Sequence, residues 1–139
     1  MQVQPYLFFD GRCEEAIEFY RKSLGAEVQM LMRFKDAPKD ACPQGGFPAG
    51  TENKVMHGSL QIGSATVLVS DGRNTGKPNF QGFGLALDAA SDPEAKRLFD
   101  ALSDGGQVQM PLGKTFFASS FGMVADKFGV VWMVLVPTH

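Results

Sequence analysis

The chain has 139 residues, of which 44% are hydrophobic and 20% are charged, and its formal net charge is −2 at pH 7. These proportions are typical of one globular domain and exclude an extended disordered protein. The lysine and arginine residues are scattered, so we expect no nucleic-acid partner and no anionic membrane as a partner. The longest uninterrupted apolar run, residues 130–136, is too short to cross a bilayer.

The first residues and the cysteines indicate the compartment. Residues 1–5 lack the basic segment of a secretory signal peptide. The two cysteines, Cys13 and Cys42, have neither the spacing of a metal site nor the pattern of a disulfide framework. We therefore expect a reduced protein in the cytoplasm.

The first half of the chain predicts one helix and four strands. The helix begins where Glu14 and Glu15 suit the positive end of the helix dipole, and it stops at Gly25. The strands are short β-prone runs, several of which alternate apolar and polar side chains. In chain order, we expect a strand at 3–9, the helix at 13–24, and strands at 26–34, 55–62 and 65–70.

The second half predicts the same succession. Its helix begins at Asp92-Pro93, because proline is favoured at the first helical position, and it stops at Gly105-Gly106. In chain order, we expect a strand at 83–88, the helix at 92–102, and strands at 107–110, 120–125 and 130–136.

An internal repeat joins the two halves. An offset of eighty residues aligns four identical residues between 3–30 and 83–110, and it also superimposes the tripeptide Val-Gln-Met at 28–30 on the same tripeptide at 108–110. We therefore expect an α+β fold made of two βαβββ modules, residues 1–70 and 82–139, within one domain.

Two loops interrupt this plan. Residues 35–54 contain three prolines and three glycines, and residues 71–81 are also rich in turn-forming residues. Long loops without secondary structure are uncommon in a small domain and are either functional or mobile. For 35–54, a lid or partner contact and simple mobility are both left open.

One face of the first sheet is the candidate binding surface. In strands the side chains alternate between the two faces, so one set packs on the helix and the other set points away from it. The outward set mixes apolar surface with a few polar groups, as small-molecule sites do. Alternatively, this face is solvated or covered by a second subunit. The candidate residues are Gln4, Tyr6, Phe8, His57, Ser59 and Gln61.

Several segments together suggest a known family. They are residues 5–11, 19–27, Met56-His57 with Ser70-Asp71, 114–122 and, most specifically, 126–133. The chain resembles the vicinal oxygen chelate superfamily, which includes glyoxalase I, extradiol dioxygenases and bleomycin-resistance proteins, and within it the PhnB-like branch. Many relatives carry tryptophan where this chain has Phe117.

The resemblance implies an open eight-stranded cup, commonly in a homodimer, but it implies no single reaction. Metal-dependent members hold the ion through four residues, whose places here fall near Gln4, Leu68, Gly84 (or Phe83) and Met133. Of these only Gln4 could ligate, so we expect no metal at the usual site and predict no cofactor. His57 is the one remaining candidate ligand.

Three functions stay open. The first is a small-molecule-binding protein similar to the resistance-type members, with Met133 added to the candidate residues given above. The second is a metal-dependent lyase, isomerase or dioxygenase with a non-standard site around His57 and Gln4. The third is a structural or interaction role of the dimer. Proteins of this branch are sometimes labelled demethylubiquinone methyltransferases, but residues 82–84, Gly-Phe-Gly, lack the pattern of a nucleotide-binding turn.

Overall fold

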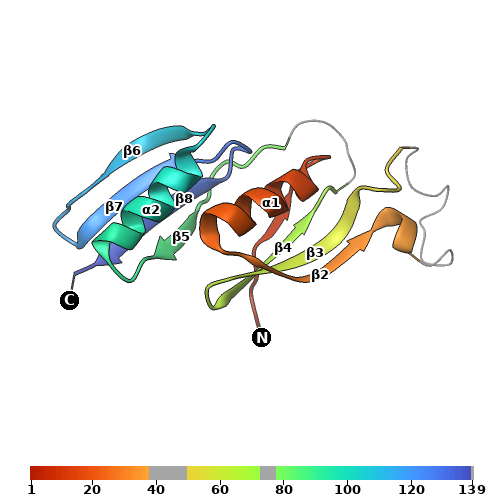
Figure 1. Cartoon of the computed structure of the whole chain (residues 1–139), viewed down its shortest axis with the longest axis horizontal. Helices are drawn as coiled ribbons and strands as arrows, with labels where there is room; N and C mark the ends of the chain where they lie inside the picture. Colours follow the sequence, from red (N-terminus) through yellow and green to blue (C-terminus); the bar gives the residue numbers. More distant parts are fainter. Residues whose placement is uncertain (38–49, 73–77, 139) are drawn as a thin grey trace. The chain divides into compact units, whose positions relative to one another are not determined.

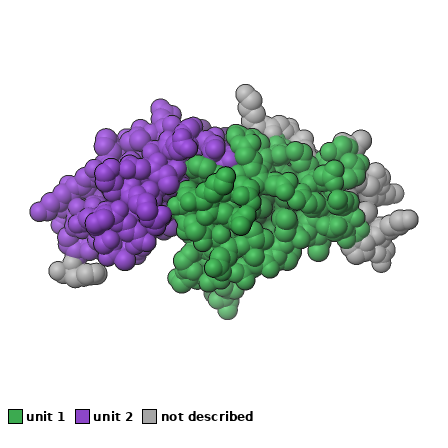
Figure 2. Space-filling model, in the orientation of Figure 1, with its two compact units in different colours: residues 1–78 green, residues 79–139 purple. Residues whose placement is uncertain are grey.

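The computed structural model describes residues 1–37, 50–72 and 78–138. The chain divides into two units, residues 1–78 and 79–139 (Figure 2). The first contains β1 (Tyr6–Phe8), α1 (Cys13–Leu24), β2 (Glu27–Arg33), the single 3₁₀ turn η1 (Phe34–Asp36), β3 (Val55–Ile62) and β4 (Ala65–Ser70). The second contains β5 (Leu85–Asp88), α2 (Asp92–Ser103), β6 (Gln107–Gly113), β7 (Ala118–Ala125) and β8 (Val131–Pro137).

Each unit is a four-stranded sheet with one helix packed on it, and Figure 1 shows this arrangement. The strand orders are β1-β4-β3-β2 and β5-β8-β7-β6. In both sheets the first strand pairs in parallel with the last strand of its unit, and the other neighbours are antiparallel. The expected α+β class and the succession of strand, helix and three strands in each half are therefore confirmed. Neither helix in the described ranges is long and apolar enough to span a membrane.

Local sequence explains where the helices begin and end. Gly25 follows α1 with φ 69°, and its N–H donates to the carbonyl of Arg21. Glycine adopts this left-handed conformation without the steric cost of a Cβ atom. Before α2, the Ser91 hydroxyl accepts from the N–H of Glu94, whose carboxylate accepts from the N–H of Ala90. This reciprocal capping fixes the start of α2.

The core of each unit lies between its helix and its sheet. In the first unit, Leu7 and Val69 are buried opposite each other in adjacent strands. In the second, a Cβ atom on Gly122 of β7 would lie 2.7 Å from Cε2 of Phe99 in α2. Glycine at this position therefore lets α2 approach the sheet closely. The larger buried side chains of the second unit are Leu98, Phe99, Leu102, Trp132 and Val134.

A β-bulge occurs at the repeated tripeptide in β2. Val28 pairs with Leu60 and Met30 pairs with Ser59, so Gln29 is the extra residue. Leu60 is buried on the helix-covered face, and its neighbour Ser59 points to the other face. The bulge therefore places Val28 and Met30 on opposite faces, although residues two apart in a regular strand share a face.

The second copy of the tripeptide forms the same bulge in β6. Val108 pairs with Val124 and Met110 pairs with Met123, leaving Gln109 as the extra residue. The conformation is thus repeated together with the sequence. This gives a physical reason for the identity of residues 28–30 and 108–110.

The ends of several elements differ from those expected. β1 is shorter than residues 3–9 and leaves Gln4 outside the strand, and β5 begins only at Leu85. β6 continues to Gly113 beyond the proline at position 111, and β7 begins at Ala118. The η1 turn occupies the start of the segment that we expected to be loop. Cys42 and the central part of that loop lie outside the described residues, as does His139.

Candidate functional site

The candidate site is the face of the first sheet that α1 does not cover, which we call the open face. Strand register aligns Tyr6 with Leu68, Leu68 with Ser59, and Ser59 with Met30 across the four strands. Phe8 lies opposite Ser70 in the next row on the same face. Apolar and hydroxyl side chains therefore alternate along this surface.

Burial in β1 agrees with this assignment. Leu7 is 1% exposed, whereas Tyr6 is 38% exposed and Phe8 is 52% exposed. Successive residues of a strand point to opposite faces, so Leu7 enters the core while the two rings stay on the open face. Two adjacent aromatic side chains are thus available to a molecule that binds on this side of the sheet.

Tyr6 joins this aromatic pair to His57. Its hydroxyl lies 2.7 Å from Nδ1 of His57, although β4 separates their strands. The Tyr6 and Phe8 rings are stacked, with centroids 4.7 Å apart and an interplanar angle of 10°. The His57 ring is tilted against Tyr6 at 5.4 Å. The structure therefore brings together three of the predicted site residues.

The Tyr6 phenol is protonated at neutral pH. Burial raises its pKa above the ordinary value, and the neighbouring Ser70 hydroxyl opposes this shift only in part. The Ser70 hydroxyl itself donates to the carbonyl of Met56 and accepts from the N–H of Gly72. The Tyr6 hydroxyl therefore meets His57 as a phenol and not as a phenolate.

The other predicted site residues named here lie in separate parts of the structure. Gln61 is engaged at the hairpin, where its Oε1 accepts from Gln29 and its Nε2 donates to the carbonyl of Gly63. Gln4 is partly buried just before β1. Met133 belongs to the second unit, where it lies opposite Ala86 in β5 and Met123 in β7. Its participation in the site stays a prediction.

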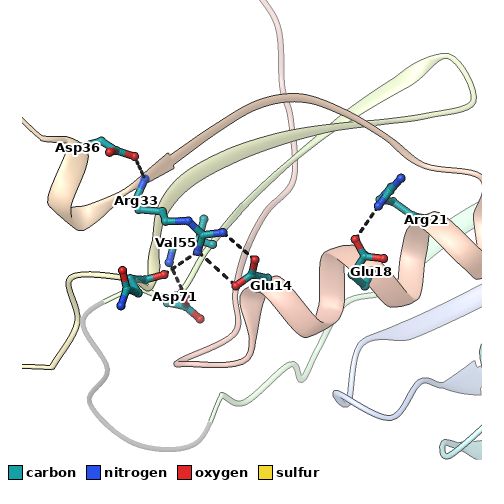
Figure 3. Close-up of polar contacts among 8 residues, drawn as sticks. Glu14, Glu18, Arg21, Arg33, Asp36, Val55 and Asp71 are labelled. Atoms are coloured by element: carbon teal, nitrogen blue, oxygen red, sulfur yellow. Dashed lines mark hydrogen bonds and ion pairs between the residues drawn. The ribbon is translucent and has the colours of Figure 1, made fainter.

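Asp71 does not hydrogen-bond to His57. Its side chain is buried, with 1% exposure, and it accepts three backbone N–H groups. Oδ1 accepts from Gly11 at 2.7 Å and from Cys13 at 2.8 Å. Oδ2 accepts from Val55 at 2.8 Å (Figure 3). This carboxylate holds the turn before α1 against the start of β3, so its role is structural. Sequence reasoning missed it because the three donors are distant in the chain.

An ion pair lies beside this carboxylate (Figure 3). Arg33 Nη2 is 2.6 Å from Glu14 Oε2, Nη1 is 3.2 Å from Oε1, and Nη1 also donates to the carbonyl of Asn53. The contact lowers the pKa of Glu14 and raises the pKa of Arg33. It connects α1 with the end of β2 and the segment before β3.

The thiol of Cys13 is unsuited to nucleophilic chemistry. It is buried at the start of α1, and burial together with the nearby Asp71 carboxylate raises its pKa far above the ordinary value. A thiolate is the reactive form of cysteine. Cys13 therefore acts as a small core residue.

The residues at the family's usual metal positions do not fit a metal ion. Leu68 has no ligating atom and lies opposite Tyr6, while Gly84 and Phe83 precede β5 and contribute no side-chain donor. Within residues 1–37, 50–72 and 78–138, no three His, Cys, Asp or Glu side chains gather in a way that could hold a metal. Hard divalent ions require several oxygen or imidazole donors.

Comparison with known proteins places the chain in a family. A family model described as 3-demethylubiquinone-9 3-methyltransferase matches residues 1–135. Protein YjdN of Escherichia coli is 39% identical over 143 aligned positions, which cover 98% of this chain and 95% of YjdN.

Solved structures have the same fold. Protein PA1353 from Pseudomonas aeruginosa is 41% identical with a TM-score of 0.85, covering 100% of this chain and 99% of its own. A putative 3-demethylubiquinone-9 3-methyltransferase, PhnB protein, from Bacillus cereus is 24% identical with a TM-score of 0.78, covering 98% and 99%. A glyoxalase-related enzyme from Fulvimarina pelagi shares the fold at 18% identity and a TM-score of 0.64, covering 98% and 88%. The chain therefore has the fold of a glyoxalase-related enzyme and belongs to the PhnB-type family described as 3-demethylubiquinone-9 3-methyltransferase.

Proposed function

We propose that the chain is a small-molecule-binding protein whose ligand lies on the open face of the first sheet, against Tyr6, Phe8 and His57. The contact between the Tyr6 hydroxyl and His57 Nδ1 is the observation that carries this proposal. A half-exposed polar pair beside two stacked rings offers both apolar contact and hydrogen bonding, the combination that small-molecule sites use. The cup that the resemblance implies stays a prediction.

Methyl transfer is not part of the proposal, although the family's description names it. Donors of the nucleotide type bind at a glycine-rich turn between a strand and a helix. In the described residues, the turn before α1 contains one glycine, Gly11, and the turn before α2, residues 89–91, contains none. These residues therefore give methyl transfer no support.

The alternative is a metal-dependent lyase, isomerase or dioxygenase with a non-standard site around His57 and Gln4. One observation favours it: Nε2 of His57 makes no hydrogen bond within the described parts of the chain. An amide and one imidazole supply fewer donors than a structural or catalytic ion normally has. This function is consequently our second candidate.

Metal analysis and ligand screening separate the two functions. We expect the purified protein to carry no stoichiometric metal, and we expect some members of a small-molecule library to raise its melting temperature. His57→Ala should abolish these shifts, whereas Phe116→Leu, at a ring 96% exposed in the second unit, should not. Stoichiometric Zn, Ni, Mn or Fe that is lost in His57→Ala would reverse the ranking.

We also propose that the protein is a cytoplasmic homodimer. The edge strand β2 exposes three large apolar side chains, Val28, Met30 and Leu31, and unpaired strand edges favour association. Cys13 is a free thiol, which suits a reducing compartment. Sedimentation that shows only monomer at micromolar concentration would contradict the dimer.

A further inference from the structure

His57 offers one ring nitrogen to a ligand on the open face, and the partner of the other nitrogen decides whether it donates or accepts. Nδ1 of His57 is 2.7 Å from the Tyr6 hydroxyl, and this is the one hydrogen bond that the His57 side chain makes within the described residues. The Tyr6 hydroxyl also interacts with the hydroxyl of Ser70. An imidazole nitrogen is a stronger acceptor than a hydroxyl oxygen, so we assign the proton of Tyr6 to Nδ1 of His57 rather than to Ser70. In a neutral imidazole one nitrogen accepts and the other carries the proton, and this assignment therefore places the imidazole proton on Nε2.

We infer that the ligand of this site carries an acceptor oxygen, of the carbonyl or carboxylate type, beside an apolar or aromatic part. The inference rests on the proposed function and names its ligand class. Nε2–H of His57 has no acceptor in the described protein and would donate to that oxygen. A donor that is partly removed from water is costly to leave without an acceptor, so ligands that supply the oxygen are favoured over those that do not.

The aromatic pair defines the other part of the ligand. The Phe8 ring stacks on Tyr6 and is 52% exposed. The stacked pair therefore offers aromatic surface to a molecule on the open face. Aromatic rings pack on one another offset-stacked or edge-to-face. An aromatic or other apolar group of the ligand would pack against Phe8.

The same tautomer favours an oxygen acceptor over a metal ion at Nε2 of His57. A histidine that ligates a metal donates its other ring N–H to an acceptor, so the bound nitrogen is unprotonated. When Tyr6 donates to Nδ1, the proton is on Nε2 and that nitrogen is blocked as a ligand. The hydrogen bond of Tyr6 thus prepares His57 to donate to an oxygen and opposes coordination.

Nitrogen-15 NMR of the imidazole ring tests the tautomer directly. The chain has two histidines, so His139→Gln leaves the ring signals of His57 alone. In this background at neutral pH we expect a protonated Nε2 and an unprotonated Nδ1, and Tyr6→Phe should shift the signals toward a mixture of tautomers. A protonated Nδ1 in the protein with Tyr6 intact would overturn the inference.

Three probes then test the ligand class. Acetophenone and benzoate carry an acceptor oxygen, and benzylamine at pH 7 carries none. We expect the first two to shift the His57 and Phe8 signals and to bind about three- to tenfold more weakly to His57→Gln, the range expected for one lost hydrogen bond. Benzylamine should bind weakly and equally to both proteins.

The outcomes distinguish an error in the inferred ligand class from an error in the proposed binding function. Equal binding of benzylamine and acetophenone at Phe8 would overturn the acceptor requirement and leave the binding site intact. If neither those probes nor the library compounds perturb any open-face residue, the proposed function itself fails. Retained probe affinity in His57→Gln, with a folded variant confirmed by its amide spectrum, would overturn the role of Nε2–H.

Discussion

The carboxylate of Asp71 accepts a hydrogen bond from the backbone N–H of Cys13 at 2.8 Å, although 58 positions separate the two residues. With Gly11 and Val55 as further donors, this buried group joins the first turn of α1 to the start of β3. It thereby fixes the end of β3 that carries His57. The geometry of the open face thus depends on a residue outside it.

Replacement of Asp71 should destabilise the protein. Asp71→Asn keeps one acceptor oxygen but turns an amide donor toward backbone N–H groups, leaving at least one buried donor unpaired. We expect a loss of about 2–3 kcal/mol in the free energy of unfolding, measured by urea titration. Asp100→Asn, at an exposed helix position, is the matched control and should change the value by less than about 0.5 kcal/mol. Equal effects of both substitutions would contradict the structural role.

The Glu14–Arg33 pair should contribute stability that depends on pH. Because the pKa of Glu14 is lowered in the folded protein, the contribution is present above the unfolded-state pKa and is lost as the pH falls through the folded-state pKa. The Glu14 side chain is 64% exposed and that of Arg33 is 24% exposed. Solvent screening at the carboxylate therefore limits the contribution to less than about 1 kcal/mol. Unfolding of Glu14→Gln should differ from the parent near pH 7 and should converge with it near pH 2.

Glu18→Gln is the control for this experiment, since Glu18 pairs with Arg21 within α1. It should show a smaller difference between the two pH values than Glu14→Gln. The effect of Glu14→Gln should also shrink in 1 M salt, because screening weakens exposed ion pairs. A difference that persists unchanged at low pH would contradict the pair as its source.

Gly122 should tolerate no side chain. A Cβ atom there would lie 2.7 Å from Phe99 and 3.0 Å from the Leu112 backbone, so Gly122→Ala must push α2 away from the sheet. We expect a loss of about 1–3 kcal/mol, read from thermal unfolding. Gly113→Ala in β6 meets nothing within 4 Å and should be close to neutral. Comparable losses in the two variants would show that crowding is not the cause.

The sequence predicted correctly those elements whose signals come from neighbouring residues. The hairpin of residues 55–62 and 65–70 is found at its expected bounds, and α1 ends before Gly25 as its sequence predicts. The eighty-residue repeat predicted that both halves share one order of elements, because similar sequences form similar secondary structure. These features depend on residues within a few positions of each other.

The parts that could not be predicted depend on distant residues. Alternation assigned Tyr6 and His57 to one face, but their hydrogen bond spans an intervening strand and depends on the register of β1, β4 and β3. The bulge at Gln29 likewise could not be predicted, because it is defined by how β2 pairs with β3. A shared face follows from alternation, whereas a contact follows only from register.

The affinity of one screened compound for matched variants shows whether the open face of the first sheet holds the ligand. Isothermal titration should compare the parent with Phe8→Ala, His57→Gln and Phe116→Leu, after each is shown to be folded. We expect Phe8→Ala and His57→Gln to bind at least threefold more weakly and Phe116→Leu to bind as the parent does. Unchanged affinity in both open-face variants would contradict a ligand site on this sheet.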